Sequence, residues 1–257
     1  MNGRRVRVRR ERPTAVAWAL ALAVTMLAVY VLTLTAALPD PATQTAAAPR
    51  VSRPLTLPPL RGWCVTLGSY PTPAAARMAA AGYAGSGAAG IVRRSEAGWQ
   101  VLGALYDSEN QARRVADHLR EAEAIEAGIL PLSADEVRLR ITAPEDQIEA
   151  IAEAAALLKT QAEQLHDLAA QLDRATLQPE AARSLCALSA TEAEALCARL
   201  AEPKEDLCAD LAKALIRLSG HLNDIAQSKP PDLPGTLRRA ALDDFLQLLT
   251  LQETAGR

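Results

Sequence analysis

The sequence lacks the residue patterns on which most catalytic and metal sites depend. Its three histidines, His118, His166 and His221, fall in separate predicted helices and show no metal-ligand spacing such as H-E-x-x-H. The run GSGAAG at 85–90 superficially resembles a dinucleotide-binding loop, but it follows a predicted helix rather than a strand. Ser69 is not part of a G-x-S-x-G elbow. We therefore predict that the protein is not an enzyme and has no catalytic residues, metal ligands or cofactor.

Cysteine is also scarce, and the four residues Cys64, Cys186, Cys197 and Cys208 are too few for a scaffold built on disulfides. The last three recur every eleven residues, a spacing that would stack them on one face of a continuous helix. Pro203 interrupts that helix. Two interpretations stay open: pairing of thiols between packed helices, and ordinary small buried residues.

Charge is absent from Pro13 through Pro39. The apolar part of this stretch, residues 15–38, would be about 36 Å long as a helix, which is enough to cross a hydrocarbon layer of about 30 Å. The alternative is a cleaved signal peptide with a small-residue site at 35–37. Cleavable apolar regions usually span only about 7–15 residues, so we predict an uncleaved transmembrane helix.

Arginine is concentrated before this helix, with six arginines in residues 1–12. Because Lys/Arg-rich flanks stay on the cytoplasmic side, we expect residues 1–14 to be a cytoplasmic basic segment. The chain would be a single-pass protein of the cell membrane, with its remaining domains extracytoplasmic. The net charge of the whole chain is −2, so the part after the basic segment is acidic. An acidic body argues against nucleic acid as a partner.

Residues 39–61 contain six prolines and no glycine. Proline favours the extended polyproline II conformation, so this segment predicts a semi-rigid linker of up to about 70 Å. Such a spacer would hold the following domain away from the bilayer.

Residues 62–133 predict a domain with the order β-α-β-β-α-β. Apolar residues alternate along the chain from Trp63 to Leu67 and are followed by a Gly-Ser-Tyr-Pro turn, which indicates a strand. The order as a whole is the split βαβ, ferredoxin-like arrangement. The expected elements are strands at 63–67, 91–94, 99–102 and 125–132, and helices over 73–86 and from 107 or 108 to about 123.

The two halves of this domain repeat each other. WCVTLGSY, followed by Ala76, Tyr83 and Gly87, corresponds to GWQVLGALY, followed by Ala112 and Leu119. On these motifs, residues 62–133 resemble the two repeats of a SPOR (sporulation-related repeat) domain, a family that commonly follows one transmembrane helix and a proline-rich linker. The resemblance implies binding to peptidoglycan glycan strands stripped of stem peptides, through the exposed face of the sheet.

Four residues are candidates for glycan binding. Thr66 and Ser69 could hydrogen-bond sugar hydroxyls, or be ordinary strand-end and turn residues. Trp99 is either a platform for a sugar ring or part of the core. Arg93, with its neighbour Arg94, could meet carboxyl groups of the glycan, or protect an edge strand by its charge.

Residues 134–257 predict a helical domain. Thr142 to Glu145 resembles a capping box, and the apolar residues from Ile148 to Leu172 then keep a 3-4 spacing for more than three heptads. Further helices are expected at 179–201, 204–227 and 235–251. Alternating Ala and Leu on their seams favours a helical bundle, with an extended dimeric coiled coil as the alternative.

The sequence thus predicts an α+β protein with a transmembrane helix, a SPOR-type domain and a helical bundle or coiled coil. We expect a membrane-anchored protein that binds peptidoglycan glycan strands in cell division, sporulation or envelope organisation. Residues 145–251 would bind a protein partner or a second copy. The alternative is a scaffold that works through this helical part without binding glycan, which Thr66 favours because many SPOR domains have glutamine at that position.

Overall fold

The computed structural model describes residues 50–256, except residue 97 and residues 201–205. The described chain is α+β, with two antiparallel sheets and six α-helices. The predicted cytoplasmic segment (1–14), transmembrane helix (15–38) and first part of the linker (39–49) lie outside the described residues. Among the helices that are described, none combines the length and apolar character needed to cross a membrane.

The larger sheet has four strands in the order β3-β4-β2-β5. It is built from β2 (Leu60–Tyr70), α2 (Pro73–Gly85), β3 (Ile91–Ser95), β4 (Gly98–Tyr106), α3 (Glu109–Ala122) and β5 (Ala127–Ala134). The predicted β-α-β-β-α-β order is confirmed. Local chemistry sets the helix starts: Thr72 caps α2 by accepting a hydrogen bond from the Ala75 amide at 3.2 Å, and Ser108 occupies the N-cap position of α3.

The second sheet pairs β1 (Arg50–Leu57) with β6 (Val137–Pro144). The sequence predicted a linker up to residue 61, but residues 50–57 form a strand that is paired along its whole length. The physical reason is that Val51, Leu55 and Leu57 project their side chains into the hydrophobic core, so that β1 has an apolar face. Pro54 is tolerated because both strands of a two-stranded sheet are edges.

The helical part consists of α4 (Glu145–Asp173), α5 (Pro179–Arg199), α6 (Asp206–Gln227), the 3₁₀ turn η1 (Pro230–Asp232) and α7 (Leu233–Ala255). The helices pack on one another within the chain as a bundle. Most of the predicted α4 seam is buried, including Ile151, Leu158 and Leu165. The predicted capping box is wrong: Thr142 belongs to β6, and its hydroxyl donates a hydrogen bond to Ser52 Oγ at 3.2 Å.

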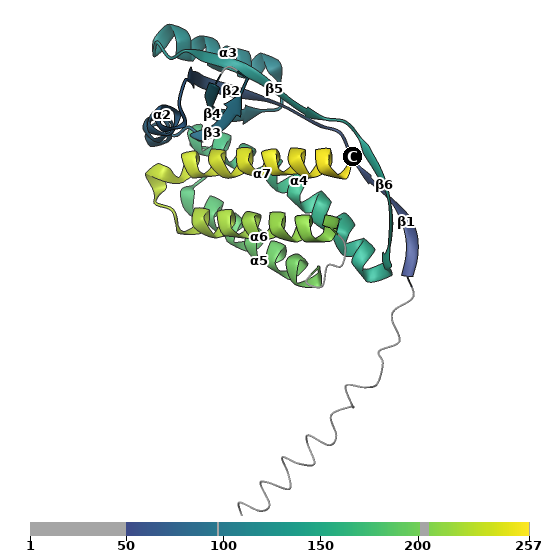
Figure 1. Cartoon of the computed structure of the whole chain (residues 1–257). Helices are drawn as coiled ribbons and strands as arrows, with labels where there is room; N and C mark the ends of the chain where they lie inside the picture. Colours follow the sequence, from purple (N-terminus) through teal and green to yellow (C-terminus); the bar gives the residue numbers. More distant parts are fainter. Residues whose placement is uncertain (1–49, 97, 201–205, 257) are drawn as a thin grey trace, which may run out of the picture. The chain divides into compact units, whose positions relative to one another are not determined.

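The four-stranded sheet is covered on both faces (Figure 1). On one face, Val65, Leu67 and Val101 pack against alanines of α2 and α3. On the other face, Cys64 and Leu102 belong to the large core that also contains α4 and α7. The sequence predicted a boundary between two domains at residues 133 and 134. One hydrophobic core instead contains residues from both sides of that boundary.

Candidate functional site

The register of the sheet arranges side chains on its bundle-facing side in rows that cross the strands. In one row, Leu102 of β4 lies opposite Ile91 of β3 and Thr66 of β2. Leu102 is fully buried and belongs to the core shared with the bundle, and Thr66 is only 8% exposed. Leu102 and Thr66 are therefore covered, and Thr66 is not accessible to a large ligand, whereas Ile91 on the edge strand is half-buried.

The next row toward the end of the sheet is polar and open. Gln100 of β4 lies opposite both Arg93 of β3 and Ser69 of β2. Residues directly opposite in an antiparallel pair share a face, so the three side chains point to the same side. Ser69 and Arg93 are exposed and Gln100 is half-buried. We call Ser69, Gln100 and Arg93 the polar row.

A β-bulge brings Ser69 into this row. Two residues of β2 lie between Thr66 and Ser69, whereas only one residue of β4 lies between their partners Leu102 and Gln100. Because of this extra residue on β2, the side chain of Ser69 lies on the same face of the sheet as that of Thr66. Strict alternation along β2 would place the two side chains on opposite faces. Gly68 adopts φ +107° inside the bulge, a conformation that favours glycine.

Trp99 lies on the opposite face of the sheet from the polar row. It is paired with Tyr70 and packs against the cluster beneath α2 and α3, where it is half-buried. Of the four predicted binding residues, the structure brings Ser69 and Arg93 together on an open surface, buries Thr66, and places Trp99 elsewhere. Gln100 was not singled out from the sequence, because its position between Ser69 and Arg93 depends on strand pairing.

A groove of about 920 Å³ runs along the edge strand β3, between α2 on one side and α6, η1 and α7 on the other. Ile91 and Val92 line it, and Arg93 follows directly on the same strand. Arg238 of α7 donates to the Gly87 carbonyl at 2.6 Å and so attaches the bundle to the α2–β3 loop. The groove is lined by charged side chains of both signs: Arg77, His221, Asp224, Asp232, Arg239 and Asp243.

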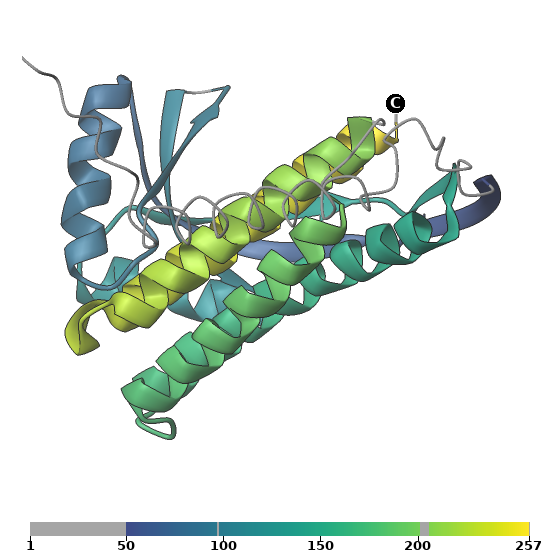
Figure 2. The ribbon, with the colours of Figure 1, turned by 90° about the horizontal axis from the view of Figure 1, so that it is seen from below.

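Part of the sheet lies beyond the helices of the bundle. Viewed from the bundle side, the long helices cross the sheet, while α2 and the β3–β4 strands extend beyond them (Figure 2). The polar row lies in that β3–β4 part, because Arg93 and Gln100 are opposite each other there. The open end of the sheet and the groove along β3 thus form adjoining surfaces.

One histidine in the groove has carboxylate neighbours on both sides of its ring. His221 Nδ1 of α6 is 3.0 Å from Asp244 Oδ1 of α7, and its Nε2 is 3.5 Å from Asp243 Oδ2. The hydrogen bond with Asp244 raises the pKa of His221, and burial raises the pKa of the Asp244 carboxyl group. Sequence reasoning missed this cluster because its members lie on two helices, more than 20 residues apart.

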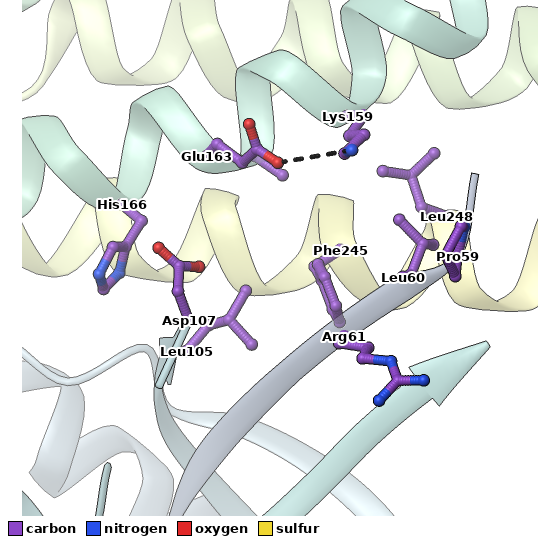
Figure 3. Close-up of a pocket in the computed structure, with 11 residues that line it drawn as sticks. Pro59, Leu60, Arg61, Leu105, Asp107, Lys159, Glu163, His166, Phe245 and Leu248 are labelled. Carbon is purple, nitrogen blue, oxygen red and sulfur yellow. Dashed lines mark ion pairs between the residues drawn. The ribbon is translucent and has the colours of Figure 1, made fainter. Parts of the chain in front are cut away.

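A smaller cavity of about 230 Å³ lies where β2 and β4 meet α4 and α7 (Figure 3). Leu105, Phe245 and Leu248 supply its apolar lining, and Lys159 and Glu163 of α4 form an ion pair at its rim with their charged atoms 4.0 Å apart. The cavity lies at the junction between sheet and bundle, and its lining also includes the ionisable side chains of Arg61, Asp107 and His166.

The described cysteines Cys64, Cys186 and Cys197 do not form disulfides. Burial raises the pKa of the Cys64 thiol to about 12 and that of Cys186 to about 11, so both stay protonated at neutral pH. Of the two interpretations of the cysteines, the structure supports small buried residues for Cys64 and Cys186.

Comparisons with protein-family models, curated proteins and solved structures found no match to this chain.

Proposed function

We propose that this chain is a membrane-anchored, extracytoplasmic protein that binds peptidoglycan glycan strands and acts in cell division, sporulation or envelope organisation. The apolar stretch 15–38 and the preceding arginines support the anchor and its orientation. The β-α-β-β-α-β module and its two internal repeats support a SPOR-type domain. These features are typical of a protein that links a membrane to the cell wall.

The polar row is the observation that carries the glycan-binding part of this proposal. Ser69, Gln100 and Arg93 offer a hydroxyl, an amide and a guanidinium group on three adjacent strands. With strands about 4.8 Å apart, the row is about 10 Å long. Hydroxyl and amide groups both donate and accept hydrogen bonds, as sugar hydroxyls do. The guanidinium group suits a carboxylate, which a glycan strand exposes where its stem peptide has been removed.

The bundle determines where a glycan strand can bind. It covers the row that contains Thr66 and Leu102, so the central part of this sheet face is closed to ligand. A strand would therefore lie across the open end of the sheet and continue into the groove along β3. This path differs from the expectation drawn from the SPOR resemblance, in which the whole exposed face would bind.

The test is a pull-down of the full-length chain, in mild detergent, with purified peptidoglycan sacculi. We expect the chain to sediment with sacculi, and to do so more strongly after an amidase has removed stem peptides. Gln100→Ala should weaken binding, because it removes the central member of the row. Sedimentation no greater than that of a control protein, with and without amidase, would contradict the proposal.

A scaffold that recruits or oligomerises partners through its helices is the second candidate. It is favoured by large apolar side chains exposed on two packed helices: Leu185 and Leu188 of α5 and Ile216 of α6. Leu188 is 70% exposed. Light scattering after size-exclusion chromatography would show a dimer or larger species that Leu188→Lys converts to monomer. A strictly monomeric wild-type chain would remove support for self-association.

A further inference from the structure

Three potential metal ligands meet beside the groove, where α6 crosses α7. His221, Asp243 and Asp244 each offer one ligand atom, and these atoms all lie within 4.8 Å of one another. His221 and Asp243 line the groove, whereas Asp244 lies behind them and is only 2% exposed. The cluster therefore has a buried side and a side that faces a cavity large enough to admit an ion.

The buried carboxylate of Asp244 is incompletely satisfied. Its Oδ1 is bonded to His221, but within the described residues its Oδ2 has no hydrogen-bond partner and almost no contact with solvent. An oxygen of this kind is costly, because burial removes it from water without replacing the lost hydrogen bonds. A cation beside the carboxylate would compensate that cost.

The charges of the cluster also favour a bound cation. Two carboxylates beside one imidazole carry two negative charges when the imidazole is neutral, and a divalent ion would match them. Asp224, which lines the same groove, adds a further negative charge, and the exposed cations of the lining are Arg77 of α2 and Arg239 of α7. A hydrogen-bonded His–Asp pair alone explains the contact at Nδ1, but it leaves Asp244 Oδ2 without a partner.

We propose that His221, Asp243 and Asp244 bind a divalent transition-metal ion, with Zn²⁺ as the best-suited ion. One imidazole nitrogen and two carboxylate oxygens are a normal ligand set for zinc, and the groove leaves a fourth position open to water or to a ligand. The imidazole disfavours Ca²⁺ and Mg²⁺, which prefer oxygen ligands. Because the site joins α6 to α7, the bound ion would also hold together two helices of the bundle.

The test is isothermal titration calorimetry, in which ZnCl₂ is added to the full-length, untagged chain after a chelator has removed bound metal. We expect saturable binding of one Zn²⁺ per chain and no comparable binding of Ca²⁺. Asp243→Asn and His221→Ala should each weaken zinc binding by at least about tenfold. Asp243 is half-buried, so Asp243→Asn is expected to fold even if His221→Ala does not, and circular dichroism would verify this.

Two matched controls separate this site from other zinc ligands. His118 is exposed on α3, on the other side of the sheet, and Cys197 is a half-buried thiol of α5. Zinc affinity should be unchanged in His118→Ala and Cys197→Ala. Absence of saturable zinc binding, unchanged affinity in a folded Asp243→Asn variant, or equal binding of Ca²⁺ would overturn the proposal.

Discussion

Truncation of Phe245 should destabilise the sheet and the bundle together. Phe245 of α7 is the sole phenylalanine of the chain and is 8% exposed. Its ring packs so closely on β2 that a Cβ added at Gly62 would lie 3.1 Å from Phe245 Cζ and 2.9 Å from Leu105 Cδ1. Gly62 is therefore required by the close approach of α7 to the strand.

The size of the effect follows from this packing. Replacing a buried Phe with Ala usually costs about 3–5 kcal/mol of unfolding free energy. Phe245 also lines the 230 Å³ cavity, so part of its surface has no close neighbour, and we expect a value near the lower end, about 3 kcal/mol. For a unit of about 200 residues this corresponds to a fall in Tm of roughly 6–12 °C.

The assay is urea and thermal unfolding of wild type and Phe245→Ala, followed by circular dichroism. Because one core joins sheet and helices, we expect a single transition that shifts as a whole. Met78→Ala, at an exposed position of α2, is the control and should change stability by less than about 0.5 kcal/mol. A loss below about 1 kcal/mol for Phe245→Ala, or a second transition left unshifted, would refute the shared core.

Two further predictions concern buried polar groups. Gln252 of α7 donates its amide to backbone carbonyls at both turns that join the two sheets, at distances of 2.7–3.5 Å. Gln252→Ala should therefore cost about 1–3 kcal/mol in urea unfolding, whereas Gln247→Ala, on the half-buried side of the same helix, should cost less. Burial raises the pKa of Cys64 from 9.0 to about 12, so the folded state is fully favoured below pH 9 and loses stability as the pH rises toward 12. Unfolding free energies measured from pH 8 to 11 should fall less steeply in Cys64→Ala than in wild type, and equal slopes would contradict this reasoning.

Local sequence signals predicted most of the secondary structure. Thr72-Pro73 and Gly87 bracket α2, and α5 and α7 begin within two residues of the predicted starts, whereas the predicted start of α6 at residue 204 lies outside the described residues. Such signals act over a few residues, through capping, fixed backbone angles and apolar spacing, so they can be read without knowledge of the fold. The β-α-β-β-α-β order followed from them.

Long-range pairing was the part that the sequence could not predict. β1 pairs with β6 at sequence separations of 80–94 residues, and the prolines in and near β1 favoured an extended linker instead. The bulge at Gly68 determines which side Ser69 faces, and pairing through Gln100 brings it together with Arg93. The His221 cluster likewise depends on how α6 packs on α7. None of these contacts leaves a periodic or local pattern.

The most direct test of the glycan-binding proposal compares two neighbouring arginines. Arg93 and Arg94 are both exposed on β3, but alternation points Arg93 to the side of the polar row and Arg94 to the opposite face. Affinity for amidase-treated sacculi should fall at least about tenfold in Arg93→Ala, as expected for the loss of a charge-assisted hydrogen bond of about 1.5–3 kcal/mol, and stay unchanged in Arg94→Ala. Equal affinities for the two variants would contradict the assignment of the polar row as the glycan-binding site.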